Sequence, residues 1–170
     1  MDKRERFLHA MRRAASSVSV VTTGGAAGRS GITVSAVCPL SADPPSVLVC
    51  VNQSSYALGL IRANGCFCVN LLSIHQSRVA DVFAGRVAEL REDRFACASW
   101  RVGATGAPEL IGALVVLNCT LVSESVFASH CVLIGEIANI EFDQDAPLLY
   151  VDRAYRGLGA MIATKAGVST

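Results

Sequence analysis

The sequence predicts a mainly β protein, an antiparallel β-barrel with a few added helices. Six or more segments have the composition of strands, and only a few have the spacing of helices. Strands and helices do not alternate strictly, as they would in a parallel sheet. No G-x-G-x-x-G motif follows the first strand, which disfavours a doubly wound fold.

The first expected element is an amphipathic helix from Arg4 to about Ala15. Asp2 and Glu5 have the spacing of a capping box, in which each side chain accepts a bond from the other's backbone N–H. Apolar side chains recur at helical spacing along this segment: Phe7, Leu8, Met11 and Ala15.

Three strands are expected next. The first covers residues 18–23 and ends at Gly24-Gly25, a hairpin turn signal, and the second returns over residues 31–37. Residues 47–52 form an unbroken apolar run, which predicts a central strand that is buried on both faces.

The middle of the chain is predicted to contain two helices around a strand. Ser54 is a candidate N-cap for a helix over residues 55–64, and Gly65 closes it. A strand is expected over residues 66–71 and a second helix over residues 74–83.

The last part of the chain is rich in β-forming residues. Residues 95–102 are expected to be irregular or a short strand. Two long strands are expected over 114–127 and 131–142, joined by a turn at 128–130, and a last strand over 148–151.

The length of 170 residues predicts a single domain over 1–170. We expect an N-terminal helix at about 4–16, a barrel at about 17–152 and a C-terminal tail at 153–170. The chain is 52% hydrophobic and only 17% charged. This excess of apolar residues indicates a second buried surface, such as an oligomer interface or a cofactor site.

The charge pattern argues against several classes of partner. The net charge of +1 gives no basic surface for nucleic acid, and no apolar run has the length of a membrane span. The charged N-terminus lacks the apolar stretch of a secretory signal, so a cytoplasmic location is expected.

Cysteine and histidine usage predicts no metal site. The seven cysteines lie mostly in apolar stretches, which indicates buried, unreactive thiols. There is no C-x-x-C pair, and the three histidines are scattered along the chain. The cysteines are Cys38, Cys50, Cys66, Cys68, Cys97, Cys119 and Cys131.

Small polar residues near strand ends indicate a site for a flat polar ring and a phosphate. Thr33 and Ser35 alternate with apolar residues, so their hydroxyls are expected on one face; ordinary β-propensity is the alternative explanation. Asn52, Ser54 and Ser55 lie between a strand and a helix, where hydroxyls and free N–H groups can hold an anion. The alternative is a plain N-cap.

Several other side chains are candidate ligands. Arg86, after Gly85 at a predicted helix end, is a possible phosphate ligand or a solvated surface arginine. His130 can bind a nicotinamide amide, bind a phosphate or move protons, or it is only an exposed turn residue. The Asn70 amide contacts a ring or satisfies local backbone, and Tyr155 is a candidate for stacking.

Taken together, these segments resemble the short-chain flavin reductases of two-component flavin-dependent monooxygenases, such as the reductase component of 4-hydroxyphenylacetate 3-monooxygenase. The resemblance runs from about Phe7 to Gly157. Its motifs are G-I-T-V-S-A-V-C at 31–38, P-P-S-V-L-V-C-V-N at 44–52, C-V-N-L-L at 68–72, F-A-G at 83–85, Arg94-Phe95, G-A-P-x-L at 106–110 and the histidine turn at 128–130.

The resemblance implies an FMN-binding split β-barrel of Greek-key type and a homodimer with a flavin site near the interface. It implies that NADH or NADPH reduces FAD or FMN, and that the reduced flavin passes to a partner oxygenase. The alternative is a non-enzymatic flavin-binding or electron-storage protein on the same fold. The choices between FAD and FMN and between NADH and NADPH stay open.

The resemblance also implies which residues contact the ligands. The positions expected to bind flavin are Thr33, Val34, Ser35, Ala36, Val37, Cys50, Val51, Asn52, Ser54, Ser55, Asn70, Leu71, Gly85 and Arg86. His130 corresponds to the family's nicotinamide-contacting histidine, and Tyr155 is a second candidate for the nicotinamide. Ala128-Ser129 stands where the family usually has Gly-Asp or Gly-Thr.

Overall fold

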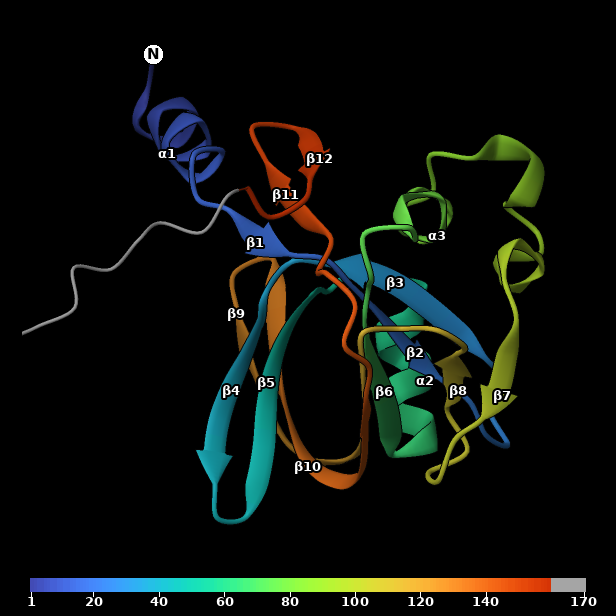
Figure 1. The fold of residues 1–170 in the computed structure, drawn as a ribbon. Helices are drawn as coiled ribbons and strands as arrows, with labels where there is room; N and C mark the ends of the chain where they lie inside the picture. Colours follow the sequence, from blue (N-terminus) through green and yellow to red (C-terminus); the bar gives the residue numbers. More distant parts are fainter. Residues whose placement is uncertain (160–170) are drawn as a thin grey trace, which may run out of the picture.

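The computed structural model describes residues 1–159. Its main feature is a seven-stranded antiparallel sheet in the order β3-β2-β6-β9-β10-β5-β4 (Figure 1). This confirms the prediction of a mainly β, antiparallel protein. The strand bounds are β2 Ser19–Thr23, β3 Ser30–Val34, β4 Val37–Ala42, β5 Pro45–Asn52, β6 Cys66–Leu71, β9 Val115–Phe127 and β10 His130–Phe142.

The two edge strands of this sheet are consecutive in the sequence. β3 ends at Val34 and β4 begins at Val37, so only Ser35 and Ala36 connect them. A link of this length spans about 11 Å, whereas the edges of a flat sheet of this width would lie about 29 Å apart. The sheet must therefore curl until β3 and β4 meet at this corner. There the Ala36 carbonyl accepts a hydrogen bond from the Cys50 N–H at 3.0 Å.

The predicted single strand over 31–37 is wrong, because the chain changes partner within it. β3 pairs with β2, whereas β4 pairs with β5. Ser35 and Ala36 are exposed between the two strands, so Thr33 and Ser35 do not share one face of a strand. β4 is absent from the predicted strands because its residues are mostly exposed and show no alternation of apolar and polar side chains.

β6 is buried on both faces, as is β2, whereas the segment 47–52, for which this is predicted, is not. Cys66 to Asn70 are all buried, because β6 lies between β2 and β9 in the middle of the sheet. In the segment 47–52 of β5 only alternate residues are buried, namely Val47, Val49 and Val51. β5 is next to the edge strand β4, so its other face is only partly covered.

Two helices cover opposite faces of the sheet. α2, Tyr56–Asn64, contributes Leu58 and Ile61 to a core with alternate residues of β5 and β6. α3, Ser77–Phe83, contributes Val79, Val82 and Phe83 to a second core on the other face. The predicted helices over 55–64 and 74–83 are thus confirmed, although α3 begins three residues late. Within residues 1–159, no helix is both long and apolar enough to cross a membrane.

The N-terminal helix α1 spans Lys3–Met11, so it ends about four residues before the predicted end at Ala15, and it has the predicted capping box. The Glu5 N–H donates to the Asp2 carboxylate at 2.7 Å, and the Asp2 N–H donates to the Glu5 carboxylate at 3.0 Å. None of the helix residues is buried. Phe7, Leu8 and Met11 are 62%, 42% and 50% exposed, so the predicted apolar face has no partner in the described chain.

Two small sheets accompany the large one. β1 Ser16–Ser17, β11 Leu149–Val151 and β12 Ala154–Arg156 form one, and β7 Trp100–Val102 and β8 Pro108–Leu110 form the other. Short 3-10 helices at Ala88–Leu90 and Arg94–Cys97 precede β7. The predicted tail over 153–170 therefore begins with a strand, and its residues 160–170 lie outside the described range.

The cysteines are less uniformly buried than predicted. All seven are free thiols; Cys38 is exposed, and Cys50 and Cys97 are half-buried. Cys38 lies on β4, the exposed edge of the sheet, which explains the difference. Burial raises the pKa of the Cys119 thiol to about 12, so it stays protonated and unreactive at neutral pH.

The turn between β9 and β10 has one residue in a left-handed backbone conformation. Phe127 pairs with His130, so the turn consists of Ala128 and Ser129. Ala128 has a φ of 49°. An L-residue with a side chain is strained in this region, and glycine is not.

We therefore expect Ala128→Gly to raise the free energy of unfolding by about 0.5–1 kcal/mol, measured by denaturant titration. Ser129→Gly is the matched control, because Ser129 has no positive φ. It should leave stability unchanged or lower it slightly through the added freedom of the unfolded chain. A lower stability of Ala128→Gly would contradict the strain argument.

Candidate functional site

A cleft of about 860 Å³ lies beside the start of α2 and β3, at the end of α3. This volume is within the range of small-molecule sites. Hydroxyl and amide side chains line one part of it: Ser30, Thr33, Asn52, Ser54 and Ser55. Four of these, all except Ser30, are residues that the sequence singles out as candidate ligands.

The segment from Asn52 to Ala57 leaves backbone N–H groups without an acceptor in residues 1–159 at the start of α2. The Asn52 side-chain oxygen accepts bonds from the Ser54 N–H at 2.9 Å and the Ser54 hydroxyl at 2.8 Å, which fixes the turn into α2. Ser55, and not Ser54 as predicted, is the N-cap, and its side chain makes no cap hydrogen bond with the described residues. Among the described residues, no acceptor bonds the N–H groups of Tyr56 and Ala57. These unpaired donors at a helix N-terminus favour negative charge.

Positive charge on the cleft comes from three arginines, Arg29, Arg91 and Arg94. Arg29 precedes β3, whereas Arg91 and Arg94 belong to the segment that follows α3. Two carboxylates, Glu92 and Asp93, also line the cleft, so the lining carries a formal charge of +1. The cleft therefore combines cations, hydroxyls and free backbone donors around one volume.

Thr33 lines the cleft but its hydroxyl already has an acceptor. It donates to the Ala80 carbonyl at 2.7 Å and so joins β3 to α3. The Thr33 oxygen can accept a further bond, but its proton is not available to a ligand without losing this contact. Ser35 and Ala36 follow at the exposed link between β3 and β4.

The histidine turn is brought next to Asn52 by strand register. β10 pairs with β5 so that His130 faces Asn52. The Gln53 N–H donates to the Ser129 carbonyl at 2.9 Å, which ties the turn to the start of the segment from Asn52 to Ala57. His130 is exposed, and its Nδ1 lies 2.9 Å from the Ser129 hydroxyl. The imidazole is thereby held at the rim, beside the cleft and outside its lining.

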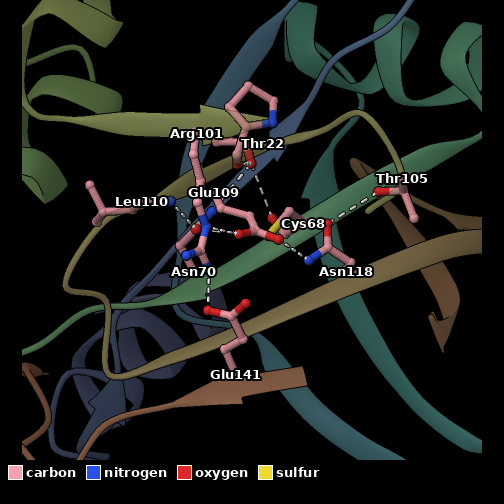
Figure 2. A network of polar contacts seen from close by, with 10 residues as sticks. Thr22, Cys68, Asn70, Arg101, Thr105, Glu109, Leu110, Asn118 and Glu141 are labelled. Carbon is pink, nitrogen blue, oxygen red and sulfur yellow. Dashed lines mark hydrogen bonds and ion pairs between the residues drawn. The ribbon is translucent and has the colours of Figure 1, made fainter. Parts of the chain in front are cut away.

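Asn70, a predicted ring contact, is instead part of a buried polar network (Figure 2). Its NH₂ group donates to the Val20 carbonyl at 3.1 Å and to the Thr22 hydroxyl at 3.2 Å, and its oxygen accepts from the Leu110 N–H at 2.7 Å. The side chain is fully buried with donor and acceptor both used. It therefore serves the alternative role, satisfying backbone groups, and cannot reach a ligand in this structure.

Arg86 and Tyr155, predicted ligands from two distant segments, both bind the carboxylate of Asp81. Arg86 contacts the Asp81 carboxylate at 2.9 Å, and the Tyr155 hydroxyl donates to the same oxygen at 2.8 Å. Arg86 also donates to the hydroxyls of Tyr155 and Tyr150, at 3.3 and 3.4 Å. This cluster fastens β11 and β12 to α3, and neither Arg86 nor Tyr155 lines the cleft.

The remaining predicted positions do not line the cleft. Val34 and Val51 are buried in the core of the sheet, and Gly85 follows Ala84, which does line the cleft. The positions outside the lining are Val34, Ser35, Ala36, Val37, Cys50, Val51, Asn70, Leu71, Gly85, Arg86, His130 and Tyr155.

Several lining residues are absent from the predicted site. Arg29, Arg91 and Phe83 come from loops and a helix end whose approach to the cleft depends on packing. The local signals are the F-A-G motif at 83–85 and the charged run from Arg91 to Arg94, whose last residue begins the Arg94-Phe95 motif. Charged runs are usually solvated surface, so this signal does not identify a site by itself.

The cluster around Asp81 predicts a pH-dependent contribution to stability. Burial, together with the bond to Asp81, raises the pKa of Tyr155 to about 12, above its ordinary value of 10. A raised pKa stabilises the fold below the ordinary value, and this stability is lost as the pH rises from 10 toward 12. We expect Tyr155→Phe to lower the free energy of unfolding by about 1 kcal/mol at neutral pH.

The difference between wild type and Tyr155→Phe should shrink in denaturation curves recorded as the pH approaches 11. Tyr56→Phe is the matched control, since the Tyr56 ring is exposed and its hydroxyl has no partner in residues 1–159. A Tyr155→Phe effect that stays constant across this pH range would contradict the assignment.

Comparison with known proteins identifies the family. Residues 11–159 match the model of the flavin reductase-like domain. The chain is 40% identical over 156 residues to FMN reductase (NADH) RutF of Ancylobacter novellus, covering 91% of this chain and 85% of the relative.

Solved structures agree with this match. A homologue of nitrilotriacetate monooxygenase component B from Mycobacterium thermoresistibile is 28% identical, with a TM-score of 0.87, over 98% of this chain and 92% of that one. The NADH:FAD oxidoreductase SgcE6 of Streptomyces globisporus, in complex with NAD and FAD fragments, is 25% identical, with a TM-score of 0.83, over 97% and 96%. The chain belongs to the flavin reductase-like domain family.

Proposed function

We propose that this chain is an NAD(P)H-dependent flavin reductase that reduces FAD or FMN and supplies the reduced flavin to a partner flavin-dependent oxygenase. The observation that carries the proposal is the cleft at the start of α2, with its unpaired backbone donors, hydroxyls and arginines. The names of the relatives support it: one is an NADH-dependent FMN reductase and another a monooxygenase component.

The residues of the cleft fit a flavin nucleotide. The first N–H groups of α2, with the hydroxyls of Ser54 and Ser55, would hold its phosphate. Thr33 and the backbone of the exposed link Ser35-Ala36 would lie along the ring. Exposed main-chain groups are suited to this, because a flavin ring edge carries both donors and acceptors.

When bound, the flavin and the nicotinamide supply the hydride chemistry itself. The chain binds and orients them. The Ser129 hydroxyl engages His130 Nδ1, which leaves Nε2 free to contact the nicotinamide amide. Hydride transfer requires no general base, so we assign none among the residues of the cleft.

We further propose that the curled sheet is the split barrel of this family and that the protein is a cytoplasmic homodimer. The link between the edge strands supports a nearly closed barrel. Large exposed apolar side chains support a second copy as a partner. They include Phe7 and Met11 of α1, Phe127 at the β9–β10 turn and Phe142 at the end of β10.

The phosphate site is tested by placing a negative charge at the N-cap. In Ser55→Asp the carboxylate caps the helix as well as serine does, so the fold is retained. We expect the KM for FMN in NADH oxidation to rise about tenfold or more, because the carboxylate competes for the same N–H groups and repels phosphate. Riboflavin, which has no phosphate, should be used with unchanged KM.

Ser55→Asn is the matched neutral control and should change the KM for FMN by less than about threefold. Equal use of FMN by Ser55→Asp and wild type would show that the phosphate binds elsewhere. A wild-type protein that binds flavin but does not oxidise NADH would refute the reductase function.

His130 is tested by separating binding from turnover. We expect His130→Ala to raise the KM for NADH about fivefold, the value of one lost hydrogen bond, with kcat changed little. His130→Gln, which keeps a donor near the same place, should recover part of the loss. Unchanged KM and kcat in His130→Ala would remove His130 from the nicotinamide site.

A further inference from the structure

A second cavity of about 370 Å³ adjoins the cleft. It lies between the turn that joins β2 to β3 and the two-stranded β7–β8 ribbon, which are neighbours in Figure 1. Arg29 lines both this cavity and the main cleft. The two volumes therefore meet at one side chain.

Arg29 is held in place but its hydrogen-bond donors are unused. Its guanidinium carbon lies 4.6 Å from the centre of the Phe95 ring, and it forms an exposed ion pair with the Asp93 carboxylate at 3.6 Å, beyond hydrogen-bond distance. Within residues 1–159 its side chain makes no hydrogen bond. By contrast, Arg62 and Arg86 each donate to a carboxylate at 3.1 Å or less.

The walls of the second cavity suit a flat ring. Gly24, Gly25 and Gly28 form one side, so backbone and not side chains borders the space there. A Cβ added at Gly28 would meet no atom within 4 Å. Trp100 lines the cavity with a fixed indole: its ring N–H donates to the Phe95 carbonyl at 3.0 Å, and it packs on Phe83 and Phe95.

We propose that this second cavity binds the adenosine half of FAD, with Arg29 contacting the pyrophosphate at the junction. The inference rests on the proposed function, since it assumes that the flavin phosphate lies in the main cleft. With its flavin half in the main cleft and its adenosine half in the second cavity, FAD would have its pyrophosphate at the junction of the two. There the guanidinium of Arg29 supplies a planar set of hydrogen-bond donors. FMN has no group that reaches the second cavity, so the arrangement selects FAD over FMN.

The test measures direct binding of FAD and FMN by calorimetric or fluorescence titration of the purified protein. Wild type should bind FAD about tenfold more tightly than FMN. Arg29→Gln should weaken FAD binding about tenfold and FMN binding less than about threefold, because only FAD carries the second phosphate. Arg91→Gln, whose side chain lines only the main cleft, should weaken both flavins by the same factor.

A bulky side chain in the second cavity gives an independent test. Val102 lines it and is 81% exposed, so Val102→Trp should fold normally. We expect this variant to lose the preference for FAD while its FMN affinity stays at the wild-type value. Val122→Trp, an exposed valine of β9 outside both cavities, should change neither affinity.

The outcomes separate this inference from the proposed function. Equal effects on FAD and FMN in both Arg29→Gln and Val102→Trp would overturn the adenosine site while leaving FMN-dependent NADH oxidation intact. A Val102→Trp variant that loses NADH affinity and keeps FAD affinity would assign the cavity to the nicotinamide dinucleotide and overturn the proposal. Failure of wild type to bind either flavin would refute the proposed function itself.

Discussion

The two-residue link between the edge strands β3 and β4 is the constraint on which the rest of the molecule depends. Because Ser35 and Ala36 must join opposite edges of the sheet, the sheet curls and its edges meet. The curl brings the end of β3 beside the end of β5, and the β10–β5 register adds the histidine turn to the same corner. Three segments that are far apart in the sequence thus become one site.

The elements that carry this site are rigid for identifiable reasons. The buried polar network around Asn70, Glu109 and Asn118 joins β6, β8 and β9, and almost every group in it has a partner (Figure 2). Thr33 bonds β3 to α3, and the Asp81 cluster bonds α3 to β11 and β12. Side chains at the cleft are therefore held by supporting contacts outside it, which is what precise ligand positioning requires.

Local patterns predicted the helices and long strands well, because periodicity and capping reflect interactions between near neighbours. The Asp2–Glu5 capping box and the Gly65 helix end are as expected, the latter with a φ of 68°. The predictions are wrong where burial or a side chain's partner depends on segments that are distant in the sequence. The burial of 47–52 was overestimated because an apolar run does not reveal that β5 neighbours an edge strand. Asn70, Arg86 and Tyr155 carry suitable chemistry but have their partners elsewhere in the chain.

The sequence by itself determined the fold class, the existence of most elements and the position of the polar segment Asn52–Ser55 just before α2. These depend on propensities and spacing within a few residues. Only the tertiary structure decided which polar groups remain free. The side chains of Thr33, Arg86 and Asn70 are hydrogen-bonded to protein atoms, whereas, among the described residues, Arg29 and the first N–H groups of α2 make no hydrogen bond. Whether a donor is available to a ligand depends on contacts between distant segments, which the order of residues along the chain does not show.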